Sequence, residues 1–334
     1  MSRSLRPAVR LLAAGLAAAL ALSACGSSDS GDGAGAEAWS FTDGSGETIT
    51  LDAVPERIIA SDAEAVGLLS YGIKPVGIYL SAPLETLPQL KDVDLTGIEI
   101  IGETWGQMDA EKAAALKPDL IVADYWTAQK THQGFGEGVD EESNKVAELA
   151  PVIGAEQEGS LEDVVQWYED FAASLGKDTE TDGKKRFEAA KADFISAVEA
   201  KPGLTALAVS PAQEMLYVAE PDLSTSLYDF REWGLDVVKP KNPNKDHLYW
   251  EYLSWENADT YQADLLLLDD RVLAAQPNAV DELGGQFPTW NSIKAAKEKA
   301  VTAWPGFWIH SWDQYAEQVE NLTAAIEKAD ENLT

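Results

Sequence analysis

Large aromatic side chains and one arginine follow several predicted strands of this 334-residue chain. Aromatic rings can bury the apolar surface of a ligand, and a guanidinium group donates several hydrogen bonds in a fixed geometry. These residue types at strand ends indicate a ligand-binding cleft. Alternatively, the rings pack in the core, and Arg271 forms a salt bridge with Asp269 or Asp270. The candidates are Tyr79, Trp105, Tyr125 and Trp126 in the first half, and Tyr217, Arg271, Trp304 and Trp308 in the second, with Trp250 and Trp290 as weaker ones.

The elements that must position these side chains alternate between strand and helix. Short apolar runs at 57–60, 119–123, 204–210 and 264–268 predict strands, and helical spacing predicts helices at 63–71, 223–233, 255–261 and 312–329. This rhythm is typical of an α/β protein with mainly parallel sheets covered by helices. Two similar βα lobes, joined by one long helix from about residue 179 to 200, are the expected architecture, and the cleft would lie where strand carboxyl ends face each other.

Five segments follow from these patterns. We predict a signal peptide at 1–24, a flexible tether at 25–37, an N-terminal lobe at 38–177, a bridging helix at 178–201 and a C-terminal lobe at 202–334. The signal rests on Arg3, Arg6 and Arg10 ahead of an apolar run that ends at Leu22. That run is about half of the roughly 20 residues that a membrane span needs.

The chain has a single cysteine, Cys25, within Leu22-Ser23-Ala24-Cys25. This placement resembles a bacterial lipobox, which implies a lipid on Cys25 and an anchor on the outer face of the cell membrane. The small polar residues that follow are typical of a tether. The alternative is an ordinary signal peptide with a cysteine there by chance.

The formal charge of the chain is −32, and loss of three arginines with residues 1–24 would make it −35. Such a surface repels nucleic acid and anionic lipid headgroups, so no nucleic-acid partner is expected. Enzyme signatures are missing too: the sequence has no Gly-x-Ser-x-Gly, no phosphate-binding Walker loop and no Gly-x-Gly-x-x-Gly after a strand. With only His132, His247 and His310, direct capture of zinc or manganese is disfavoured, since it needs about four converging ligands.

Three stretches together resemble the substrate-binding proteins of ATP-driven importers for ferric siderophores and cobalamin. The stretches are Val54-Pro55-Glu56-Arg57-Ile58-Ile59-Ala60 with 67–77, Met108-Asp109-Ala110-Glu111 with 115–121, and Ser254-Trp255-Glu256 with 263–267. The resemblance implies two Rossmann-like lobes joined by one long α-helix, the class III periplasmic-binding-protein fold. It also implies a monomeric lipoprotein receptor for iron transport, not an enzyme, which presents its ligand to an ABC permease.

In the family, one surface glutamate from each lobe docks on the permease, and the matching residues here are Glu111 and Glu256. The other possibility is that both are ordinary acids near helix N-termini. The resemblance implies no cofactor and no metal of the protein's own, with iron present only inside the bound siderophore.

Charge guides the choice of ligand. Beyond the signal the only arginines are Arg57, Arg186, Arg231 and Arg271, too few for a trianionic catecholate complex. We therefore expect a hydroxamate siderophore, in which Arg271 donates to hydroxamate oxygens. A cobalamin or haem ligand is the alternative on the same fold, with Tyr125 or His310 as an axial haem ligand. A lipid-anchored adhesin or structural protein is the alternative from a different class.

Overall fold

The computed structural model describes residues 38–245, 249–306 and 309–334, which lie in one compact unit, Ala36–Thr334. The predicted signal, the tether with Cys25, and Trp308 lie outside the described residues. None of the helices in the described part of the chain is long and apolar enough to cross a bilayer.

The first half is built on a five-stranded parallel sheet with the order β5-β4-β3-β6-β9. Its central strands are buried on both faces, which explains why they read as continuous apolar runs. The bounds are β3 (Ile58–Ser61), β4 (Gly77–Tyr79), β5 (Glu99–Gly102), β6 (Leu120–Val122) and β9 (Val152–Ile153).

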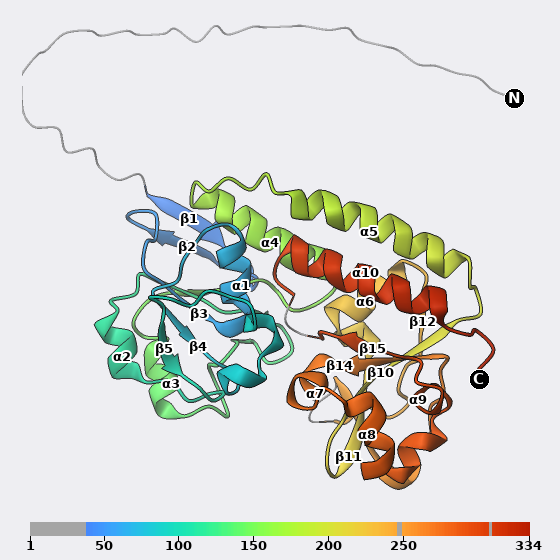
Figure 1. Cartoon of the computed structure of the whole chain (residues 1–334). Helices are drawn as coiled ribbons and strands as arrows, with labels where there is room; N and C mark the ends of the chain where they lie inside the picture. The colour runs from blue at the N-terminus through green and yellow to red at the C-terminus, as the bar shows by residue number, and fades with distance from the viewer. Residues whose placement is uncertain (1–37, 246–248, 307–308) are drawn as a thin grey trace, which may run out of the picture. The chain divides into compact units, whose positions relative to one another are not determined.

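Helices and two antiparallel hairpins surround this sheet (Figure 1). The first hairpin pairs Trp39 with Leu51. The helices are α1 (Asp62–Ser70), α2 (Ala110–Ala115) and α3 (Glu141–Val146), with 3-10 turns η1 (Leu84–Thr86) and η2 (Pro88–Leu90). The hairpins are β1 (Trp39–Thr42) with β2 (Thr48–Leu51), and β7 (Tyr125–Trp126) with β8 (Thr131–His132).

The second half contains a six-stranded mixed sheet. Strands β12, β14 and β15 run parallel to their neighbours, whereas β11 pairs antiparallel with both β10 and β13. The bounds are β10 (Thr205–Pro211), β11 (Met215–Ala219), β12 (Asp236–Val237), β13 (Trp250–Ser254), β14 (Leu265–Asp269) and β15 (Val301–Trp304).

The helices of the second half differ from the sequence predictions at two places. The predicted helix at 255–261 is only a 3-10 turn, because the backbone N–H groups of Ala258 and Thr260 bond carbonyl oxygens three residues earlier, those of Trp255 and Asn257. The helix predicted at 223–233 starts later, at Thr225, because the Ser224 hydroxyl caps it. The elements are η3 (Pro221–Leu223), α6 (Thr225–Glu232), η4 (Trp255–Asn257), α7 (Asp270–Ala275), α8 (Ala279–Gln286), η5 (Pro288–Ser292) and α9 (Lys294–Lys297).

A helical layer joins the two halves. It consists of α4 (Leu161–Ser174), α5 (Asp182–Glu199) and α10 (Trp312–Lys328), and α5 and α10 lie side by side (Figure 1). Phe187 of α5 stacks on Tyr315 of α10 with ring centres 4.5 Å apart, and Arg186 pairs with Glu320. The buried residues of α10 recur every three or four positions, which aligns one apolar face against α5. The predicted fold class is thus confirmed, while the lobe boundaries at 38–177, 178–201 and 202–334 stay predictions.

One buried carboxylate fastens three of these helices together. Asp229 of α6 is 2% exposed, and it accepts hydrogen bonds from the Glu162 backbone N–H of α4 at 3.1 Å and from the Tyr315 hydroxyl of α10 at 2.6 Å. Burial raises the pKa of Asp229 from 3.8 to about 6, although the Tyr315 hydrogen bond acts in the opposite direction. Between about pH 4 and pH 6, the Asp229 carboxyl group is therefore protonated in the folded protein but ionised in the unfolded chain.

We expect this group to make stability fall as pH rises through that window. Because the folded state binds more protons than the unfolded state there, the free energy of unfolding decreases with pH. Asp229→Asn removes the titration, so the variant should gain about 2 kcal/mol relative to wild type between pH 4 and pH 7. Urea unfolding of both proteins at pH 4.5, 5.5 and 7 measures this difference. A difference that stays constant with pH would show that Asp229 titrates normally.

Candidate ligand-binding cleft

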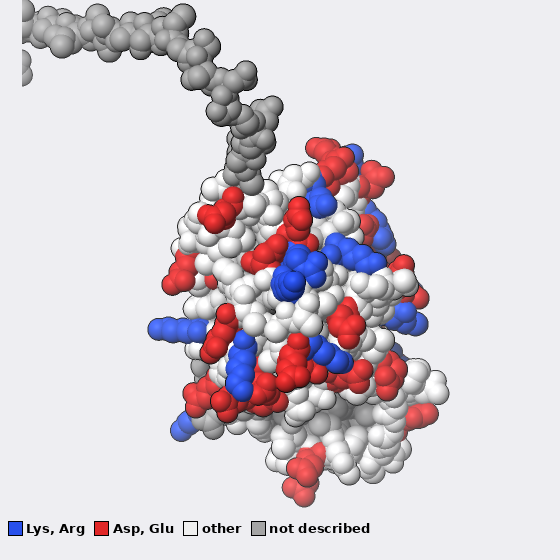
Figure 2. Space-filling model, turned by 90° about the vertical axis from the view of Figure 1, so that its left-hand side faces the viewer, with Lys and Arg blue, Asp and Glu red and all other residues white. Residues whose placement is uncertain are grey.

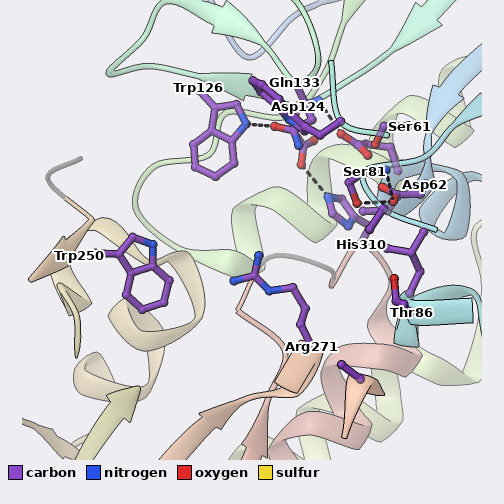
Figure 3. A pocket seen from close by; sticks show the side chains of 16 residues that line it. Ser61, Asp62, Ser81, Thr86, Asp124, Trp126, Gln133, Trp250, Arg271 and His310 are labelled. Carbon is purple, nitrogen blue, oxygen red and sulfur yellow. Dashed lines mark hydrogen bonds and ion pairs between the residues drawn. The ribbon is translucent and has the colours of Figure 1, made fainter. Parts of the chain in front are cut away.

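A cavity of about 580 Å³ lies at the carboxyl ends of strands from both sheets. Ser61 is the last residue of β3 and Asp124 follows β6 in the first sheet, and Arg271 follows β14 of the second (Figure 3). This is the position where ligands bind in open α/β folds. The lining residues are Ser61, Asp62, Ala63, Glu64, Ser81, Ala82, Thr86, Leu87, Trp105, Asp124, Trp126, Gln133, Trp250, Arg271, Ala275 and His310.

The first half contributes an acidic side of the cavity, which begins with Asp62 at the start of α1. One Asp62 oxygen accepts hydrogen bonds from the Ser81 backbone N–H at 2.9 Å and the Ser81 hydroxyl at 2.6 Å. The other accepts from the Ala63 N–H at 2.8 Å. Burial raises the pKa of Asp62, and the Ser81 hydrogen bonds limit that rise. These bonds hold the loop after β4 against the start of α1.

Glu64 is the most strongly perturbed acid of the cavity. Its Oε1 accepts a hydrogen bond from the Asp124 backbone N–H at 2.9 Å, and its Oε2 has no hydrogen-bond partner among the described residues. Burial raises the pKa of Glu64 to about 8, and the negative charge of Asp124 adds to the rise. Glu64 is therefore largely protonated at neutral pH in the free protein.

Asp124 and His310 connect the first half to the segment that precedes α10. His310 Nε2 lies 2.6 Å from Asp124 Oδ2, and both side chains are buried. Asp124 also accepts from the Tyr168 hydroxyl at 2.6 Å and from Gln157 Nε2 at 2.5 Å. Gly67 of α1 allows the approach, because a Cβ there would lie 2.8 Å from the His310 carbonyl oxygen.

Three tryptophans form the aromatic part of the lining. Trp105 follows β5 and is 47% exposed, which is unusual for so large an apolar side chain. Trp126 on β7 is oriented by a 2.8 Å hydrogen bond from its Nε1 to Gln133 Oε1. Trp250 on β13 belongs to the second half of the protein (Figure 3). It packs against Tyr217 and Tyr249. The cavity thus presents rings from both halves of the protein.

Arg271 lines the cavity and also pairs with Asp269, so the two alternatives from the sequence coexist. Its Nε lies 2.9 Å from Asp269 Oδ1, and its Nη2 lies 2.5 Å from Oδ2. Asp269 caps α7 as well, by accepting from the Arg271 N–H at 3.0 Å. These contacts with Asp269 fix the plane of the guanidinium group, which lies on the side of the cavity opposite Asp124 (Figure 3).

Of the eight predicted ligand-binding residues, Trp105, Trp126 and Arg271 line the cavity. The weaker candidate Trp250 also lines it, whereas Trp290 is buried in the core of the second half. Trp308 lies outside the described residues. The remaining four are Tyr79, Tyr125, Tyr217 and Trp304, which are not among the described residues that line the cavity.

Each of these four has a local packing role instead. Tyr79 is in the core and donates from its hydroxyl to the Gln133 carbonyl oxygen at 2.7 Å. Tyr125 packs against His132 across the β7–β8 hairpin, and Tyr217 packs between Trp250 and Tyr252. Trp304 is 1% exposed and donates from Nε1 to Ser226 Oγ at 3.0 Å. A position next to a strand end is therefore not sufficient for a side chain to face the cavity.

Sequence reasoning missed the acidic side of the cavity. Asp124 directly follows the predicted strand at 119–123, and Asp62 lies two residues after the predicted strand at 57–60, the same signal that selected the tryptophans. Glu64 lies within the first turn of α1 and gave no signal. His310 was considered only as a haem ligand, and its pairing with Asp124 is a contact between residues far apart in the chain.

The two predicted docking glutamates are both exposed and lie on different halves of the protein. Glu111 is in the first turn of α2, which Asp109 caps by accepting from the Lys112 N–H at 2.9 Å. Glu256 lies in the 3-10 turn η4 that follows β13. On the face of the molecule that carries α2, acidic side chains lie among lysines and arginines (Figure 2).

Comparison with known proteins supports the resemblance. The family model described as "Periplasmic binding protein" matches residues 94–306, more than half of the chain. The structure is similar to DesE, a ferric-siderophore receptor protein from Streptomyces coelicolor, with 32% identity and a TM-score of 0.79 over 88% of this chain and 99% of DesE. No curated protein sequence matches this chain.

Two more distant structures share the fold. FhuD2 from Staphylococcus aureus with bound ferrioxamine B is 18% identical, with a TM-score of 0.57 over 81% of this chain and 98% of FhuD2. SirA from the same organism, complexed with staphyloferrin B, is 17% identical, with a TM-score of 0.58 over 88% of this chain and 99% of SirA. The family match, together with the DesE similarity over nearly all of the described residues, shows that this chain belongs to the periplasmic binding protein family.

Proposed function

We propose that this protein is an extracytoplasmic receptor that binds a ferric siderophore of the hydroxamate type and delivers it to an ABC importer. The observation that carries the proposal is the composition of the cavity between the two sheets. Tryptophans from both halves offer apolar walls, and Arg271 offers a fixed hydrogen-bond donor. The similarity to a protein described as a ferric-siderophore receptor supports the same ligand class.

Charge in the cavity favours a neutral or cationic complex. The carboxylates of Asp62 and Asp124 line it beside the largely protonated Glu64, whereas Arg271 is the only arginine or lysine among its described lining residues. A ferric triscatecholate carries three negative charges, which the acidic side would repel. A ferric trihydroxamate lacks that charge and presents oxygens that a guanidinium group can bind.

The chemistry of the site contains nothing that requires a covalent reaction. We infer a binding protein and not an enzyme, with no cofactor of its own and iron only within the siderophore. The haem alternative loses support, since Tyr125 is not among the described lining residues and His310 Nε2 is already engaged by Asp124. Attachment to the membrane through lipid on Cys25, and a monomeric state, remain part of the proposal.

The proposed ligand can be identified directly. The protein is purified gently from iron-starved cells of its own host, and native mass spectrometry then measures the mass of what it retains. We expect one iron-loaded hydroxamate siderophore per chain. A retained porphyrin or corrin, or a catecholate complex, would contradict the proposal.

Docking on the permease is proposed to use Glu111 and Glu256. Because both are exposed on different halves, they can make a two-point contact with basic residues of a partner, which chiefly sets orientation and association rate. We expect Glu111→Arg combined with Glu256→Arg to abolish uptake of iron-55-labelled siderophore by cells, while the siderophore affinity of the purified protein is unchanged. The matched control is Glu47→Arg with Glu188→Arg, two exposed acids outside these elements. Normal uptake by the first double variant would refute the docking role.

A further inference from the structure

Three buried side chains with metal-ligating groups meet beside the cavity. They come from three separate segments: Glu64 from α1, Asp124 from the end of β6, and His310 from the segment before α10. One ligand atom from each lies within 4.8 Å of the others. Their exposed fractions are 2%, 4% and 1%, so they are not a chance group of surface acids.

A second observation is that one oxygen of this cluster lacks a bonding partner. Glu64 Oε2 is buried and has no hydrogen-bond partner among the described residues. A buried polar atom left unpaired costs about 1–3 kcal/mol, so a cation that displaces the Glu64 proton and bonds this oxygen would be stabilising. The same oxygen exposes less than 1 Å² of surface, so solvent does not reach it. A metal ion binds a carboxylate oxygen at about 2.0–2.2 Å, well inside hydrogen-bond distance.

The three ligands are already held in place by neighbours. Tyr168 and Gln157 bond the carboxylate of Asp124, and the Asp124 backbone N–H holds Glu64 Oε1. The His310 backbone N–H donates to Gln314 Oε1 at 3.1 Å. Hydrogen bonds of this kind around the ligands orient them and raise metal affinity.

We propose that Glu64, Asp124 and His310 form a binding site for a divalent transition-metal ion of the Zn²⁺ type, with a fourth coordination position facing the cavity. One imidazole and two carboxylates match the mixed nitrogen and oxygen ligands of zinc, whereas calcium and magnesium take oxygen ligands in larger numbers. Asp124 and His310 must separate slightly, because 2.6 Å is shorter than the roughly 3.3 Å between ligands in a tetrahedral zinc site.

Such an ion would fasten the segment before α10 to the first half of the protein. His310 is joined to α10 through a short connection, whereas Glu64 and Asp124 belong to the first sheet and its helix. The site also explains how a chain without a histidine-rich loop can bind a metal, since the fold brings the ligands together from positions 64, 124 and 310. The inference does not depend on which siderophore, if any, the cavity binds.

Isothermal titration of ZnCl₂ into the untagged, metal-free mature protein, without siderophore, tests the site. We expect one ion per chain with a micromolar or tighter dissociation constant. Glu64→Gln and His310→Gln should each weaken binding about tenfold or more, in line with the loss of a ligand. The control His132→Gln changes the other described histidine, which pairs with Asp43, and should leave zinc binding unchanged.

Wild-type protein that shows no saturable one-site binding would overturn the proposal, as would His310→Gln that binds zinc as tightly as wild type. Circular dichroism establishes whether each variant is folded. If a variant is unfolded, the site is tested by adding Co²⁺ to the wild-type protein. Bound cobalt in a site of low coordination number gives intense visible absorption bands. Absence of these bands would also overturn the assignment.

Discussion

Trp105→Ala combined with Trp126→Ala is expected to lower the affinity for a ferric trihydroxamate by about 100-fold. Each ring should contribute about tenfold, because truncating an aromatic residue that lines a binding pocket costs about 1–2 kcal/mol of binding free energy. Trp105 is the sharper test of the two. It is 47% exposed, so its ring contributes little to the core and its role is best explained by a ligand.

Tyr252→Ala provides the matched control for this experiment. Tyr252 is another exposed aromatic residue, 36% exposed, on β13 and outside the described lining of the cavity. Its removal should leave ligand affinity unchanged. Equal affinity of wild type and the double tryptophan variant, measured by calorimetry on folded protein, would show that the ligand does not occupy this cavity.

Asp124→Ala is expected to destabilise the protein by about 3–5 kcal/mol. Asp124 accepts from Tyr168 and Gln157 and pairs with His310, so its loss removes a contact from two buried side chains, Tyr168 and His310, and from the partly buried Gln157. Each buried polar group that loses its hydrogen-bond partner costs about 1–3 kcal/mol, because it stays desolvated, and several such groups add to an effect of this size. The midpoint of urea unfolding at pH 7 measures the effect.

The control for this prediction is Asp193→Ala, which removes an exposed aspartate of α5. Surface substitutions of this kind change stability by about 0.5 kcal/mol or less. If Asp124→Ala were as stable as Asp193→Ala, the network around Asp124 would not hold the segment before α10 to the first half.

Local patterns predicted most of the fold. Buried parallel strands read as apolar runs, and helices such as α10 showed their spacing directly, so the α/β class and the joining helix followed. The errors in the predicted secondary structure were also confined to short segments. The 3-10 turn at 255–257 could not be distinguished from a helix start, because a 3-10 turn and the first turn of an α-helix need the same kinds of residue.

The cleft was predicted less completely, for a physical reason. A residue that follows a strand lies near the cavity, but the direction of its side chain decides whether the residue lines the cavity. Trp126 points into the cavity while its neighbour Tyr125 packs on His132, although both follow the same strand. The cluster of Glu64, Asp124 and His310 depends on tertiary contacts between distant segments, which no local pattern reveals.

The most direct measurement of the central claim is a tryptophan-fluorescence titration of the purified protein with two ferric complexes. The tryptophans that line the cavity should report binding there. We predict saturable one-to-one quenching by ferrioxamine B and much weaker binding of ferric enterobactin, since the acidic side of the cavity repels a trianion. Tighter binding of ferric enterobactin, or no saturable response to either complex, would contradict the account.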